Sequence, residues 1–177
     1  MANALTASRL VLVLPLAVAF ARPEFLAPGL LAILLSVGML TDYVDGPVAR
    51  LRGTASSKGQ LFDHATDCLF VTGGLAGAAS AGMVTALLPA LIPIAFGQYV
   101  VDSYVWGRQK RLRASFLGRW NGIFYFVPLG ILAGARLPFP PVFVSFLLAV
   151  ANALGYVLVI STLASIADRA TTTIRTH

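Results

Sequence analysis

The chain has 177 residues, of which 58% are hydrophobic and only 11% are charged. A soluble domain carries about 25% charged residues, so this composition excludes an ordinary soluble domain and predicts an integral membrane protein. The length suits one domain over residues 1–177, and the single cysteine, Cys68, excludes an internal disulfide bond.

The distribution of apolar residues predicts an all-α fold of six transmembrane helices, because a membrane-spanning helix needs about 20 mostly apolar residues. The long apolar stretch after Asp67 is divided by a turn at Ser80–Met83, and the sequence LPFPP at Leu137–Pro141 ends the fifth helix. The six predicted helices cover about 5–21, 25–44, 59–79, 83–106, 120–135 and 142–167. An even number of spans places both termini on the same side of the membrane.

The positive charges indicate which side that is. The net charge is +6, and of the 13 lysine and arginine residues only Arg22 and Arg136 fall on the side opposite the termini. Cytoplasmic loops carry the excess of positive charge, so we expect both termini and the segment Thr41–Asp67 to face the cytoplasm. In a bacterium the membrane would be the inner, or plasma, membrane. The basic excess needs no nucleic-acid partner, and it also favours contact with anionic lipid headgroups.

Two local features of the apolar segments allow a second interpretation. Ala19–Ala21 follows an apolar stretch and is similar to a signal-peptide cleavage site, but removal of the first helix would break the charge asymmetry, so we retain it as a span. Gly73 and Gly77 form a pair of small residues that lets helices approach closely. That contact is either intramolecular or part of a homodimer.

Four aspartates lie in one short segment of this apolar chain. Asp42 and Asp45 are three residues apart at the end of the second predicted helix, and Asp63 and Asp67 are four apart near the start of the third. Either spacing places both carboxylates on one helical face. Because a short loop joins the two helices, we expect the four side chains to converge at the cytoplasmic edge of the membrane.

Each carboxylate at membrane depth costs about 2.5–3.5 kcal/mol, so this cluster needs compensation. Arginine partners, raised pKa values and bound cations are the three possibilities, and divalent cations fit best because the nearby basic residues lie in the loop. Oxygen ligands favour Mg²⁺, Mn²⁺ or Ca²⁺ over Zn²⁺. We expect His64 to point to a different face from its neighbour Asp63, and Cys68 to be a small packing residue.

The residues between the two acidic pairs suit a phosphate-containing ligand. Gly46 allows close approach to the backbone, and Arg50 presents a planar fork for phosphate oxygens. Gly59 lies one turn before Asp63, where a bulky side chain would fill the cleft. Metal ions together with an arginine indicate a diphosphate ligand.

These residues resemble the signature of the CDP-alcohol phosphotransferase family, D-x2-D-G-x2-A-R-x8-G-x3-D-x3-D. All eight of its fixed positions match: Asp42, Asp45, Gly46, Ala49, Arg50, Gly59, Asp63 and Asp67. The signature covers about 26 residues, and the six-helix layout extends the resemblance over the whole chain.

The resemblance implies a phospholipid-synthesis enzyme that transfers a phosphatidyl group from CDP-diacylglycerol to a small alcohol and releases CMP. The four aspartates would bind two divalent cations, Mg²⁺ or Mn²⁺, and Asp67 would also be the general base for the acceptor hydroxyl. Gly46, Ala49, Arg50 and Gly59 would line the CDP site. A homodimer is implied by resemblance alone.

The start of the chain, NALTASR, is similar to the N-terminal pattern of phosphatidylglycerophosphate synthases and related cardiolipin synthases, through Asn3, Leu5, Thr6 and Arg9. This branch implies sn-glycerol 3-phosphate as the acceptor, with its phosphate bound near the fifth helix. The candidate acceptor-binding residues are Arg108, Arg111, Arg119 and Asp102, among basic neighbours that include Lys110 and Arg113. Asp102 either binds an acceptor hydroxyl or pairs with an arginine of a loop.

Several alternatives stay open at this point. The chain differs from that branch at His64, Cys68 and Val101–Asp102, so inositol phosphate, serine or phosphatidylglycerol are other possible acceptors. A divalent-cation transporter would also use buried acids, although it would place them at mid-membrane on several helices. An inactive scaffold that kept the fold is the third alternative.

Overall fold

The structure, a computed structural model, describes residues 2–51, 56–106 and 116–175, and the secondary structure within these ranges is entirely helical. The predicted all-α class is therefore confirmed. The elements are α1 (Ala2–Ala21), the 3₁₀ turn η1 (Pro23–Phe25), α2 (Pro28–Leu51), α3 (Ser57–Ser80), α4 (Leu87–Val101), the π-helical segment η2 (Asp102–Trp106), α5 (Phe116–Phe124), α6 (Phe126–Ala135) and α7 (Pro141–Arg175).

Each of the six predicted helices is found, although several of their bounds differ. Helix α2 begins at Pro28 instead of near Phe25, α4 begins at Leu87 instead of near Met83, and α7 continues to Arg175 instead of ending near Ala167. Helix α2 continues to Leu51 instead of ending near Val44. The apolar run ends there, but a helix can continue into the polar interface once it leaves hydrocarbon. The fifth predicted helix is divided at Tyr125 into α5 and α6, although the Tyr125 amide still donates a helical hydrogen bond to the Asn121 carbonyl at 2.9 Å.

Two of the described helices are long and apolar enough to cross a membrane. These are Phe116–Ala135, which joins α5 and α6, and Pro141–Thr171 in α7. Shorter apolar stretches cover Arg9–Ala21 in α1 and Pro28–Thr41 in α2. That all six helices span the bilayer stays a prediction.

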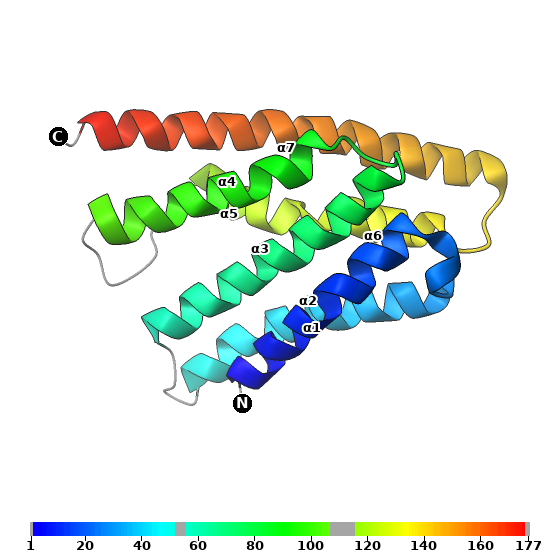
Figure 1. Ribbon diagram of the computed structural model, residues 1–177, viewed down its shortest axis with the longest axis horizontal. Helices are drawn as coiled ribbons and strands as arrows, with labels where there is room; N and C mark the ends of the chain where they lie inside the picture. Colours follow the sequence, from blue (N-terminus) through cyan, green and yellow to red (C-terminus); the bar gives the residue numbers. More distant parts are fainter. Residues whose placement is uncertain (1, 52–55, 107–115, 176–177) are drawn as a thin grey trace.

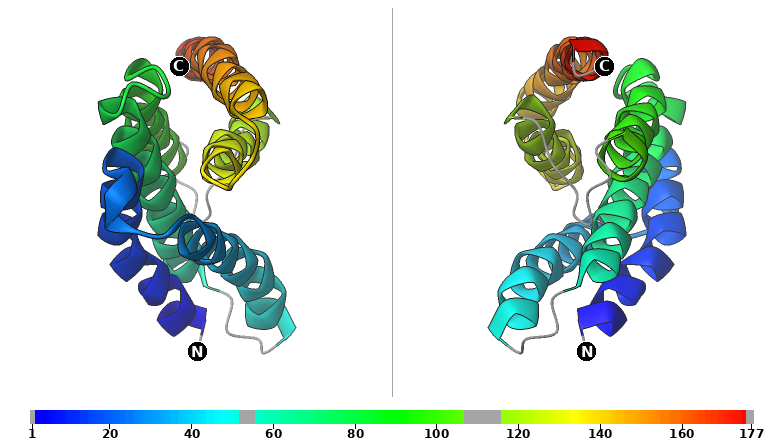
Figure 2. Two further views of the ribbon diagram at one scale, coloured as in Figure 1. Left: turned by 90° about the vertical axis from the view of Figure 1, so that its right-hand side faces the viewer. Right: turned by 90° about the vertical axis from the view of Figure 1, so that its left-hand side faces the viewer.

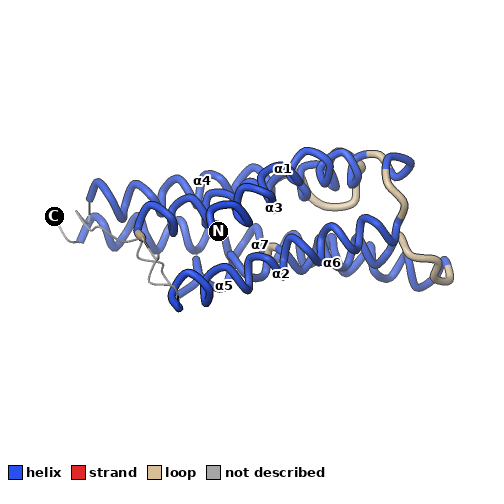
Figure 3. Tube along the Cα trace, turned by 90° about the horizontal axis from the view of Figure 1, so that it is seen from below, coloured by secondary structure: helices blue, strands red, loops and turns tan. Residues whose placement is uncertain are grey.

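The helices form two layers. Helices α1, α3 and α4 lie side by side in one layer, and α2, α5, α6 and α7 make the other (Figures 2 and 3). Apart from α5 and α6, which continue one another, successive helices run in opposite directions, so the two chain ends and the α2–α3 connection lie toward the same end of the bundle, on the left of Figure 1. The side of the membrane that this end faces is a prediction from the charges.

The buried core lies where the layers meet. Leu16 and Phe20 of α1, Leu75 of α3, Leu88 of α4 and Leu129 of α6 are almost completely inaccessible. By contrast, large apolar side chains such as Val142, Phe146 and Ile160 of α7 are exposed. This arrangement suits a bundle whose outer surface contacts lipid.

Helix α1 packs closely along α3 because α3 has glycine at two contact points. A Cβ atom built on Gly77 would lie 2.1 Å from the carbonyl oxygen of Ala17, and one on Gly73 would lie 2.8 Å from a methyl group of Val13. Within the described residues, the glycine pair therefore serves an intramolecular contact. Gly82 has a different role, since its φ of +72° forms the predicted turn between α3 and α4.

Arg136 forms hydrogen bonds with the C-terminal end of α1. Its guanidinium donates hydrogen bonds to two of the last carbonyls of α1, those of Ala19 and Phe20, the second at 2.8 Å. The same group lies 5.5 Å from the centre of the Phe20 ring. Burial lowers the pKa of Arg136 from its ordinary value and Glu24 opposes that shift, but an arginine stays charged at neutral pH.

We expect Gly77→Ala to destabilise the protein, because the added methyl group can be accommodated only if α1 moves away from α3. The expected loss is about 1–3 kcal/mol, measured by thermal unfolding in detergent. Gly130→Ala on α6 is the matched control, since a Cβ there meets nothing within 4 Å. Equal stability of the two variants would show that the α1–α3 contact is not tight.

Candidate functional site

The first turns of α3 carry the second acidic pair. Ser56 caps this helix by accepting a hydrogen bond from the Gly59 amide at 3.0 Å, which satisfies one of the free donors at the helix start. Asp63 and Asp67 follow at a spacing of four residues on one face, and their side chains are 25% and 22% exposed. The predicted convergence of these two carboxylates is therefore observed.

Arg9 of α1 lies directly against this pair. Its Nη2 donates to Asp63 Oδ1 at 2.7 Å, and its Nη1 donates to Asp67 Oδ1. The Arg9 side chain is only 1% exposed, so a buried guanidinium pairs with two partly exposed carboxylates where α1 meets α3. Arginine partners were one of the three possibilities but ranked below cations, because that reasoning considered only the basic residues of the loop; Arg9 of α1 is such a partner.

His64 belongs to the same cluster, contrary to the expectation that it would face elsewhere. One ligand atom from each of Asp63, His64 and Asp67 lies within 4.8 Å of the others. The His64 ring nitrogen Nδ1 is 3.9 Å from Asp63 Oδ2, whereas Arg9 Nη2 donates to the other oxygen of that carboxylate, Oδ1. The carboxylate oxygens of Asp63 and Asp67 suit Mg²⁺ or Mn²⁺, whereas the imidazole nitrogen of His64 is a more usual ligand for transition metals such as Zn²⁺, so the fit to a divalent cation rests on the two carboxylates.

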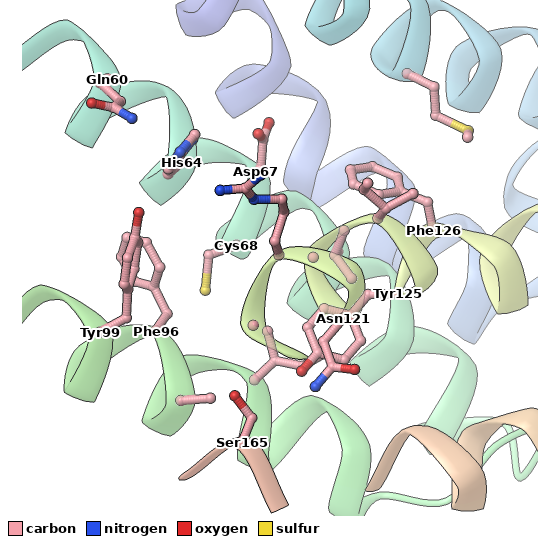
Figure 4. A pocket seen from close by; sticks show the side chains of 18 of the residues that line it. Gln60, His64, Asp67, Cys68, Phe96, Tyr99, Asn121, Tyr125, Phe126 and Ser165 are labelled. Carbon is pink, nitrogen blue, oxygen red and sulfur yellow. The ribbon is translucent and has the colours of Figure 1, made fainter. Parts of the chain in front are cut away.

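A pocket of about 980 Å³ opens between the two helical layers, beside this cluster. Asp67 and His64 lie at one end of it, while Asn121 and Ser165 lie at the other (Figure 4). Apolar and aromatic side chains such as Val71, Ile92 and Phe126 line much of the remaining wall. The pocket therefore combines an acidic end with a long apolar surface.

Two arginines also line this pocket, Arg119 of α5 and Arg169 of α7. The Arg169 guanidinium lies 4.9 Å from the centre of the Tyr99 ring, a cation–π contact, and its Nη1 is 3.9 Å from Asp102 Oδ2. Asp102 therefore pairs with an arginine, as one of the two interpretations expected, although this arginine belongs to α7 and not to a loop. Arg169 was not among the predicted site residues.

A buried hydrogen-bond network supports the wall of the pocket opposite the aspartates. Ser161 of α7 donates to the Asn121 amide oxygen at 2.6 Å, and the Tyr125 and Thr162 hydroxyls lie 2.7 Å apart. Thr162 in turn donates to the Leu158 carbonyl at 2.6 Å. These contacts hold the break between α5 and α6 against α7. The sequence signal for them was weak, because single polar residues in apolar helices have no characteristic spacing.

The remaining predicted residues are described only in part. The backbone of Asp42, Asp45, Gly46, Ala49 and Arg50 lies in the last turns of α2, but the side chains of these residues lie outside the described part. Arg108, Lys110, Arg111 and Arg113 also lie outside it. Gly59 is in the first turn of α3, and Cys68 packs against the core with its Sγ 4.0 Å from Thr72 Oγ1, as expected of a packing residue.

One of three comparisons with known proteins identifies a family for this chain. The model of one protein family, CDP-alcohol phosphatidyltransferase, matches residues 1–164. The matched range contains all four aspartates, the cluster on α3 and most of α7. Searches of curated proteins and of solved structures gave no match.

We expect Ser56→Ala to loosen the start of α3, because the Gly59 amide loses its acceptor. The expected cost is about 1 kcal/mol, seen as faster amide hydrogen exchange in the first turn of α3. Ser57→Ala, one residue further on, is the control and should exchange like the unmodified protein. Unchanged exchange in Ser56→Ala would mean that the cap contributes nothing to the helix start.

Proposed function

The chain belongs to the CDP-alcohol phosphatidyltransferase family, and from this premise we propose that it transfers a phosphatidyl group from CDP-diacylglycerol to sn-glycerol 3-phosphate and releases CMP. It is a membrane enzyme of phospholipid synthesis, and the reaction class follows from the family. The proposal also includes the following points. The acceptor is glycerol 3-phosphate, residues 1–177 form a single domain, and the protein is a homodimer. Both termini face the cytoplasm, and in a bacterium the protein lies in the plasma membrane.

One observation supports this function above the others: Asp67 faces a large pocket that is acidic and basic toward one end and apolar along its length. A CDP-lipid has the same division, with a charged diphosphate head and two acyl chains. A cation pathway would need acids from several helices at mid-membrane, whereas here Arg9 is paired with the acids of α3.

We assign the metal-binding role to Asp42, Asp45, Asp63 and Asp67, which would hold two divalent cations, Mg²⁺ or Mn²⁺. Such ions, when bound, supply positive charge that stabilises the diphosphate and the leaving CMP. Gly46, Ala49, Arg50 and Gly59 would contact the CDP group, with Arg50 on its diphosphate. The position of Gly59 in the capped first turn of α3 agrees with a close approach of the nucleotide.

Asp67 acts in this proposal as the general base. It accepts the proton of the acceptor hydroxyl while the hydroxyl oxygen forms a bond to the phosphorus that carries diacylglycerol. The bond from that phosphorus to the bridging oxygen breaks, and CMP leaves with the electron pair. The location of Asp67 on the pocket wall supports this role, because a base must reach the hydroxyl that it deprotonates.

Arg119 and Arg169 are the described residues best placed to bind the phosphate of the acceptor. Both line the pocket, and the Arg169 side chain is only 10% exposed, which strengthens its attraction for an anion. Asp102 holds Arg169 in place and would act through it. Arg108 and Arg111 complete the proposed acceptor-binding set.

We expect Asp67→Asn to lower CMP release by about 100-fold or more, because the amide cannot accept the proton. The assay uses purified protein in detergent with radiolabelled CDP-diacylglycerol, glycerol 3-phosphate and Mg²⁺. Addition of EDTA to the unmodified protein should also abolish CMP release. Glu24→Gln, which changes an acid at the opposite end of the bundle, is the control; equal activity of both variants would exclude Asp67 as the base.

Arg119→Gln and Arg169→Gln should each raise KM for glycerol 3-phosphate by about tenfold or more, because a charge-assisted hydrogen bond to phosphate is lost. KM for CDP-diacylglycerol should change little, and Arg22→Gln serves as the control.

Inositol phosphate, serine and phosphatidylglycerol are tested as acceptors in parallel. CMP release with one of these, and none with glycerol 3-phosphate, would correct the acceptor while leaving the reaction class intact.

A further inference from the structure

Arg9 is an unusual residue for a membrane helix because it is a fully buried cation. Its side chain is 1% exposed, and it is the largest of the completely buried side chains in the described part of the chain. Long basic side chains normally extend toward the membrane interface. Arg9 instead reaches across from α1 to the carboxylates of α3.

Arg9 approaches the two aspartates from α1, and one of them, Asp67, also lines the pocket. Arg9 contacts the Oδ1 oxygen of both Asp63 and Asp67. Asp67 and His64 line the pocket, but Arg9 does not. A cation bound among Asp63, His64 and Asp67 would therefore share the same two carboxylates with the guanidinium.

The close packing of α1 keeps this guanidinium in position. Gly73 and Gly77 bring α1 into direct contact with α3, and Arg136 holds the opposite end of α1 by its last carbonyls. Arg9 therefore has little freedom to withdraw when a metal ion binds. Two positive charges that share carboxylates in a poorly solvated site repel each other strongly.

We propose that Arg9 is a built-in counter-ion that limits the affinity of this site for divalent cations. It compensates part of the negative charge when no metal ion is present, so the protein can fold with its acid cluster partly buried. It also weakens metal binding, because each incoming ion meets a positive charge that is already in place. This inference rests on the metal site of the proposed function, and it concerns how tightly that site binds rather than which reaction follows.

The experiment measures Mn²⁺ binding to the purified, metal-free protein in detergent by electron paramagnetic resonance, without substrate. We expect Arg9→Gln to bind Mn²⁺ about tenfold more tightly than the unmodified protein, because the repulsion is removed. In EDTA the same variant should unfold at a lower temperature, and Mn²⁺ should raise that temperature more than it does in the unmodified protein.

Arg136→Gln is the matched control, because it removes a second partly buried guanidinium that also holds α1. Arg136 contacts the carbonyl of Phe20, which lies about 16 Å along the helix from Arg9. We therefore expect Arg136→Gln to lose stability without a change in Mn²⁺ affinity. Arg9→Lys keeps the charge and should bind Mn²⁺ within about threefold of the unmodified protein. It tests the proposal even if Arg9→Gln does not fold.

The outcomes separate this proposal from the proposed function. If Arg9→Gln binds Mn²⁺ as the unmodified protein does, or more weakly, Arg9 is a structural or ligand-orienting residue and the proposal is wrong, while the metal site stands. A tenfold loss of affinity in Arg9→Lys would also overturn it, since the geometry of the fork and not its charge would then determine binding. If neither the unmodified protein nor Arg9→Gln binds Mn²⁺, both the metal site and this inference fail.

Discussion

The buried contact between Arg9 and the two carboxylates of α3 links the packing of this bundle to its chemistry. Charged groups in a poorly hydrated environment are costly unless each finds an opposite charge at hydrogen-bond distance. Asp63 and Asp67 obtain that partner only if α1 lies close to α3. The glycines of α3 permit this approach, and residues with no chemical function thereby determine the electrostatics of the site.

The arrangement of the helices in two layers explains why the pocket has two kinds of wall. The α1–α3–α4 layer contributes the acidic cluster and Tyr99, and the opposite layer contributes Arg119 and Arg169. Charged side chains from both layers line the pocket, together with many apolar side chains. A lipid with a charged head and acyl chains can therefore be held by one continuous cavity, with its head near the acids.

The sequence predicted well what depends on neighbouring residues and poorly what depends on how helices are rotated against each other. Apolar runs predicted the six helices, and a spacing of four predicted that Asp63 and Asp67 share a face. The pairing of Arg9 with these residues was missed because 54 and 58 positions separate the partners along the chain. His64 was misjudged for a related reason: adjacent helical residues differ in direction by about 100°, yet a long side chain at the edge of the acidic face still reaches the same centre. The stacking of Arg169 on Tyr99 depends on the contact between α4 and α7, which no local pattern encodes.

Helix α7 is longer than a helix must be to cross a membrane once. Its 35 residues extend for about 52 Å, whereas the hydrocarbon layer is about 30 Å thick. Either a strong tilt or a projecting end must absorb the excess. A projecting C-terminal end would place Arg169 at the depth of the lipid headgroups, where one guanidinium is within reach of groups in both the water and the lipid phase.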